Sequence, residues 1–188
     1  GVSMDYSSLG DTVRAKIKKL IELISNPEVE PDTRRLNMEV LFRELGGAIY
    51  NKIFDMNAFD FDITDAKPQG IDDDMYYGMA KRASDAVSTG GKALLDQQID
   101  TFIAVTIAKA QGDAYQIAMQ TAKRPQIKRE LVSETCNWCK DKVTHGWVSD
   151  PDSSLFSRHR DCDCRILTRG YRSRNGLLKN YVKPKDRS

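Results

Sequence analysis

All four cysteines of the chain lie within 29 positions, in two short clusters. The first cluster is C-N-W-C between Cys136 and Cys139, and the second is H-R-D-C-D-C between His159 and Cys164. Together they read C-x2-C-x19-H-x2-C-x-C. Tetrahedral zinc sites use paired cysteine and histidine ligands that a loop separates in this way. The pattern therefore predicts a structural zinc site.

Two other uses of the cysteines are open. Disulfides are one, but Cys162 and Cys164 flank a single residue and are poorly placed to bridge each other. The N-terminus shows no secretory signal, so we expect a reducing compartment in which disulfides do not persist. Buried, inert thiols are the other use, but Asp161 and Asp163 make the flanks too polar for a core strand. Zinc remains the favoured interpretation.

Five side chains compete for four zinc positions, and two ligand sets are open. In an extended segment Cys162 and Cys164 point to the same face, which would allow four cysteine ligands with His159 packed nearby. Three cysteines and His159 would serve equally well. His145 has no partner at ligand spacing, so we expect a surface or packing role for it. The candidate ligands are Cys136, Cys139, His159, Cys162 and Cys164.

The motifs of common enzyme classes are absent from the sequence. It contains no H-E-x-x-H, nucleophile elbow, P-loop or G-x-G-x-x-G. No histidine or cysteine precedes Cys136, whereas zinc deaminases need such a ligand upstream of their cysteine pair. We therefore expect a protein that is not an enzyme and a zinc ion that is closed by four protein ligands.

Apolar periodicity predicts helices over most of the first two-thirds of the chain. Gly46-Gly47 falls inside the second helix and could permit a kink or a close approach by a neighbour, while residues 111–113 could interrupt the fourth. Residues 59–74 read as an acidic loop, and strands are predicted at 127–132 and 164–168. The helices are expected at about residues 12–26, 31–53, 72–89 and 91–122.

These elements predict a mainly helical α+β protein, in which a helical N-terminal body precedes a small zinc-clamped β-hairpin. Residues 1–90 would form the helical region, 91–170 a long helix with the clamped hairpin, and 171–188 a basic, flexible tail. No apolar run approaches the ~20 residues of a membrane span, so no membrane contact is expected.

Charge is distributed unevenly along the chain. From residue 157 to the end there are ten Lys or Arg against three Asp, whereas residues 55–74 hold seven Asp and one Lys. A basic end suggests contact with DNA or an acidic partner, although a merely solvated tail would look the same. The acidic loop could pair with a second copy in a homo-oligomer. The candidate contact residues are Arg165, Arg169, Arg172, Arg174 and Lys179.

The order of parts over residues 91–168 resembles the Mu F-like family of phage minor head proteins, also called head morphogenesis proteins. The shared parts are a long helix, a strand, C-x2-C, a loop, H-x2-C-x-C and a closing strand. The family usually has H-P-x-C-R-C in its second cluster, where this chain has arginine and aspartate at positions 160 and 163. The resemblance implies a virion structural protein without catalytic residues.

Such a protein would join portal or capsid during assembly in the bacterial cytoplasm, and it could contact packaged DNA. The alternative from another class is a zinc-stabilised nucleic-acid-binding protein. It would use the basic tail together with Trp138, Trp147 and Tyr171, because aromatic rings stack on bases.

Overall fold

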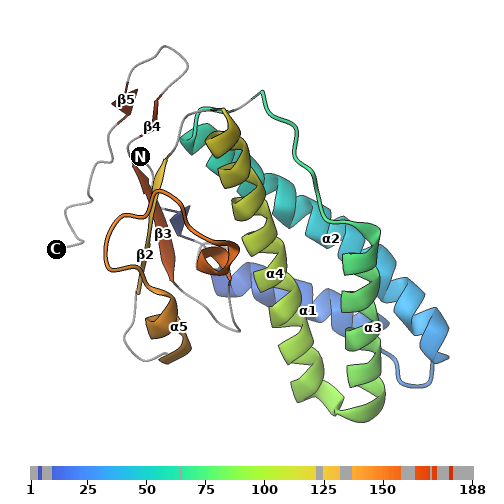
Figure 1. The fold of residues 1–188 in the computed structure, drawn as a ribbon. Helices are drawn as coiled ribbons and strands as arrows, with labels where there is room; N and C mark the ends of the chain where they lie inside the picture. Colours follow the sequence, from blue (N-terminus) through green and yellow to red (C-terminus); the bar gives the residue numbers. More distant parts are fainter. Residues whose placement is uncertain are drawn as a thin grey trace.

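The computed structural model describes residues 4–5, 10–63, 65–121, 125–131, 137–157, 164–169, 171–172 and 178–179. Helices α2, α3 and α4 pack against one another, and α1 packs on α2 (Figure 1). Among the described helices, none combines the length and apolar character that a membrane span requires. The four long helices are α1 (Gly10–Ile24), α2 (Pro31–Asp60), α3 (Asp73–Thr89) and α4 (Gly91–Gln120).

Side chains that cap backbone N–H groups mark the starts of α2 and α3. The Glu30 carboxylate accepts hydrogen bonds from the backbone of Asp32 and Thr33 at 3.1 and 3.0 Å. Asp72 accepts one from the backbone of Met75 at 2.8 Å. These bonds satisfy donors that have no acceptor within the helix. Both predicted helix starts are confirmed.

Gly46 lets two neighbouring rings approach the axis of α2. A Cβ at this position would lie 2.8 Å from Cε1 of Tyr76 on α3 and 3.2 Å from Cε2 of Phe102 on α4. Phe102 also stacks on Phe42 of α2, with ring centroids 4.3 Å apart. The predicted close approach is confirmed, and α2 runs through the glycine pair as one helix.

Helix α4 continues through residues 111–113, so the predicted interruption is wrong. A glycine inside a helix costs only about 1 kcal/mol relative to alanine. On both sides of that glycine α4 buries apolar side chains, from Ile107 to Ala118, and this burial outweighs the cost. The break between α3 and α4 falls at Gly90 and Gly91 as predicted, and Gly91 has a φ of +67° that favours glycine.

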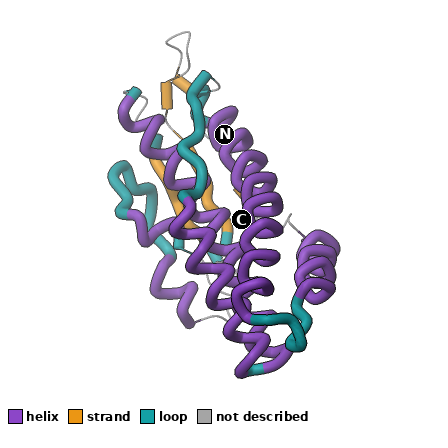
Figure 2. Tube along the Cα trace, turned by 90° about the vertical axis from the view of Figure 1, so that its right-hand side faces the viewer, coloured by secondary structure: helices purple, strands orange, loops and turns teal. Residues whose placement is uncertain are grey.

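A three-stranded antiparallel sheet in the order β1-β3-β2 lies beside α4 (Figure 1) and behind the helices in the turned view (Figure 2). β2 (Gln126–Glu130) pairs with β3 (Arg165–Arg169), and β1 (Met4–Asp5) pairs with the other edge of β3. The two strands predicted around the cysteine clusters are confirmed. β1 was not predicted, because two residues carry no periodic pattern.

One apolar core joins the helices to the sheet. Ile127 of β2 and Ile166 of β3 are fully buried in the same cluster as the helix side chains. Phe156, in the 3-10 helix η2 (Ser153–Phe156), packs on Tyr115 of α4 with ring centroids 5.6 Å apart. The chain is therefore a mainly helical α+β protein, as predicted.

The predicted region boundaries at residues 90 and 170 stay predictions. Across the first boundary, α4 packs on α2 and α3. Beyond the second, β4 (Tyr171–Arg172) pairs with β5 (Leu178–Lys179) in a separate antiparallel ladder.

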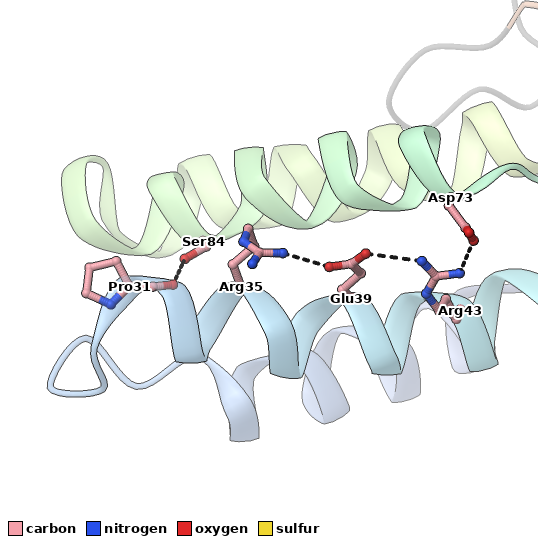
Figure 3. Close-up of polar contacts among 6 residues, drawn as sticks. All are labelled: Pro31, Arg35, Glu39, Arg43, Asp73 and Ser84. Carbon is pink, nitrogen blue, oxygen red and sulfur yellow. Dashed lines mark hydrogen bonds and ion pairs between the residues drawn. The ribbon is translucent and has the colours of Figure 1, made fainter.

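A row of ion pairs lies along the seam between α2 and α3 (Figure 3). Glu39 contacts Arg35 at 2.7 Å and Arg43 at 3.1 Å, and Arg43 also pairs with Asp73. Arg43 and Asp73 are exposed and Arg35 and Glu39 are partly buried, and ion pairs near a surface typically contribute at most about 1 kcal/mol each. Buried apolar contacts therefore do more than this row to hold α2 and α3 together.

Candidate metal centre

Cys139 and Cys164, one from each cysteine cluster, lie together in a buried cluster. Cys139 is on the short helix α5 (Asn137–Lys142), and Cys164 directly precedes β3. Their exposed fractions are 1% and 0%, and Leu131 packs against them. The fold therefore brings the two cysteine clusters together through at least one member of each.

The pairing of β2 with β3 explains this placement. Glu130 lies opposite Arg165 in the antiparallel register. Leu131 and Cys164 are the next residues outward on the two strands, so they meet at the same end of the ladder. The chain after α5 is tied back to β2, because the Thr144 backbone N–H donates to the Arg129 carbonyl at 3.3 Å.

Arg129 braces the segment that leads into the second cluster. Its side chain is buried, and Nη1 donates to the carbonyl of Leu155 at 2.8 Å and to that of Ser157 at 2.5 Å. Charge-assisted bonds to backbone carbonyls are stronger than neutral ones. Sequence reasoning missed this residue. The sequence did hold a signal for its burial: Arg129 follows Ile127 by two residues, and side chains two residues apart lie on the same face of a strand.

Positively charged side chains lie over the rings of both tryptophans near the candidate metal centre. Arg129 and Lys142 are 5.6 and 5.4 Å from the ring centroid of Trp138, which is 39% exposed. Lys128 is 6.0 Å from the centroid of Trp147. Such contacts orient the rings and shield part of their apolar surface. The side chain of Tyr171, the third aromatic residue named from the sequence, lies outside the described side chains.

His145 is exposed, in agreement with the surface role expected for it. Three candidate ligands, Cys136, His159 and Cys162, lie outside the described residues. Within the described part of the chain, no group of three or more His, Cys, Asp or Glu side chains could hold a metal ion. The ligand set therefore stays a prediction.

The described thiols fit a zinc site in chemistry and placement. Thiolates are preferred zinc ligands, and structural sites draw them from two short segments. The two cysteines are buried at the end of a paired strand ladder, where a closed site would exclude water. The residues present are thus compatible with the predicted ion.

The basic candidates are spread over several short elements. Arg165 and Arg169 are the ends of β3, Arg172 is in β4 and Lys179 is in β5, each with its backbone described. Arg174 lies outside the described residues. Nucleic-acid contact by these residues stays a prediction.

In comparisons with known proteins, no family model, curated protein or solved structure matches this chain.

Proposed function

We propose that the chain is a phage virion structural protein of the minor head type, which associates with portal or capsid and carries one structural zinc ion. The observation that supports this best is the buried contact cluster of Cys139 and Cys164 at the end of the β2–β3 ladder. It agrees with the strand, C-x2-C, loop, H-x2-C-x-C and strand order that motivates the resemblance. The helical body before it supplies the surface for a protein partner.

The predicted ligands are Cys136, Cys139, His159, Cys162 and Cys164, of which four would bind. Bound zinc would crosslink the two clusters and add its binding free energy to folding. Arg129 would hold the approach to His159 through the carbonyls of Leu155 and Ser157. No catalytic role is proposed for any residue.

Exposed apolar side chains on α2 support a protein partner. Leu36 and Val40 lie one turn apart and are 53% and 66% exposed. Exposed apolar side chains that neighbour one another in a contiguous patch mark contact surfaces. Co-purification with portal or capsid protein at high salt, lost in Val40→Asp, would support the assignment. Retained co-purification in that variant would exclude this surface as the contact.

The first experiment is native mass spectrometry of the reduced protein, before and after EDTA. We expect the mass of one zinc ion per chain, lost on chelation together with thermal stability. Cys139→Ser should lose the zinc, and His145→Asn, which alters an exposed histidine, should keep it. A metal-free wild type with unchanged stability in EDTA would overturn the zinc proposal.

A nucleic-acid-binding protein is the second candidate, favoured by the cations around Trp138 and Trp147. It predicts DNA binding that weakens steeply with salt, because phosphate contacts release counterions. Removal of residues 170–188 should then abolish binding. Binding that is equally tight at low and high salt, or that survives the truncation, would contradict this candidate.

A further inference from the structure

A cavity of about 430 Å³ lies between α4, the first turn of α3 and η2, away from the cysteine cluster. Cavities that hold small molecules commonly have this volume and a largely apolar lining. Four of its lining residues are apolar: Met75, Val105, Ala108 and Phe156. Its other lining residues are Lys109, Gly112, Asp113, Gln116 and Ser157.

The polar wall of the cavity is one connected network. The Tyr50 hydroxyl donates to Oδ2 of Asp113 at 2.5 Å, and Lys109 Nζ donates to Oδ1 at 2.7 Å. Lys109 also reaches the Gln69 side-chain carbonyl at 3.4 Å. Asp113 is 5% exposed, and these bonds from Tyr50 and Lys109 fix the orientation of its carboxylate.

This network retains both donor and acceptor capacity. An ammonium has three N–H donors, and the described contacts of Lys109 use two. A carboxylate has about four lone-pair positions, and the described contacts of Asp113 use two. Gln116 adds an amide with both functions. A carboxamide, whose carbonyl accepts and whose N–H donates, complements this wall.

The charge of the lining limits the ligand further. Lys109 and Asp113 are its two charged residues, and they neutralise each other. The lining carries no net charge, so it would not compensate a charge on a ligand. We propose that this cavity is a binding site for a small neutral molecule with an apolar body and one carboxamide-like edge.

Gly112 offers a way to close the site without disturbing the core. A Cβ there would meet no atom within 4 Å, so a larger side chain would enter the cavity space. Gly47 is the matched control, because it is also a helical glycine with nothing within 4 Å of a Cβ. Both Gly→Met changes replace a poor helix former with a good one, so both variants should fold.

The test uses three ligands of nearly identical shape and different charge: benzamide, benzoate and benzamidine. Ligand-observed NMR should give a benzamide dissociation constant on the order of 1 mM for the wild type, as for a fragment of this size. Benzoate and benzamidine should bind at least about tenfold more weakly. Gly112→Met should weaken benzamide at least about tenfold, and Gly47→Met should leave it unchanged.

A second readout locates the ligand independently of the variants. Benzamide should shift the methyl resonance of Met75, which lines the cavity, and not that of Met119, which does not. Absence of benzamide binding, equal effects of the two glycine variants, or preference for either charged analogue would overturn the proposal. So would a shift confined to Met119.

Discussion

The guanidinium of Arg34 on α2 donates two hydrogen bonds to Ser84 on α3, one to its hydroxyl and one to its carbonyl, each at 3.0 Å. The same guanidinium reaches the carbonyls of Val29 and Asn26 at 3.4 and 3.5 Å and contacts Ser88. Arg34 is 1% exposed. One buried side chain therefore joins α2, α3 and the turn after α1.

Arg34→Met should lower the free energy of unfolding by about 2–4 kcal/mol, because it removes the charge-assisted hydrogen bonds that the buried guanidinium donates to Ser84 and to the carbonyls of Val29 and Asn26. Arg43→Met is the control, since Arg43 is exposed and pairs with Glu39 and Asp73, and it should cost less than about 1 kcal/mol. Urea unfolding of both variants measures the difference. Equal losses in the two variants would contradict a special role for Arg34.

The adjacent glycines of α2 should respond in opposite ways to alanine. Gly46→Ala places a Cβ against the buried rings of Tyr76 and Phe102 and should cost about 1–3 kcal/mol. Gly47→Ala meets nothing and should stabilise the helix by up to about 1 kcal/mol. Thermal unfolding of the two variants gives the sign directly. If both substitutions stabilised the protein, the prediction for Gly46→Ala would be wrong, because the rings of Tyr76 and Phe102 would then move aside at little cost.

Two buried tyrosines predict a loss of stability at alkaline pH. Burial raises the pKa of Tyr115 to about 12, and burial with the hydrogen bond to Asp113 raises the pKa of Tyr50. The folded state therefore holds these protons more tightly than the unfolded state, whose tyrosine pKa is about 10. The stability that they contribute is complete below about pH 10 and is lost as the pH rises towards the folded-state values.

Each tyrosine should lower the free energy of unfolding by up to about 1.4 kcal/mol per pH unit above about pH 10. Tyr115→Phe and Tyr50→Phe should each reduce that slope, and the exposed Tyr77→Phe should not. Urea unfolding between about pH 8 and about pH 11 tests this. If the free energy of unfolding fell with pH at the same slope in all three variants, the alkaline loss of stability would not come from Tyr50 and Tyr115.

Arg129 should matter for both the fold and the predicted zinc site. Arg129→Met removes the donor to the Leu155 and Ser157 carbonyls and should cost about 2–4 kcal/mol. Zinc affinity should fall about 10-fold to 100-fold, as for other supports of metal ligands. Lys128→Met, one residue earlier and partly exposed, should change either quantity little. A chromophoric chelator competition measures the affinity, and unchanged values for Arg129→Met would exclude the brace.

Local chemistry made the helix starts and the strand pair predictable from the sequence. Glu30 precedes Pro31, and Asp72 opens an acidic run, so their caps are readable without tertiary contacts. The strand character on either side of the cysteine clusters likewise predicted β2 and β3. The predicted interruption of α4 at Gly112 was wrong. The helix-propensity penalty of one glycine is smaller than the free energy gained by burying the apolar side chains on both sides of it.

The sequence by itself determined where α2 and α3 begin, which segments beside the cysteines have strand character, and that the potential zinc ligands gather in two clusters. These features depend on neighbours within a few residues. Only the tertiary structure decided that Arg34 is buried against α3, that Arg129 holds the segment before the second cluster, and that Tyr50 and Lys109 meet at Asp113. Tyr50 and Asp113 are 63 residues apart, and helix packing, which no local pattern encodes, brings them together.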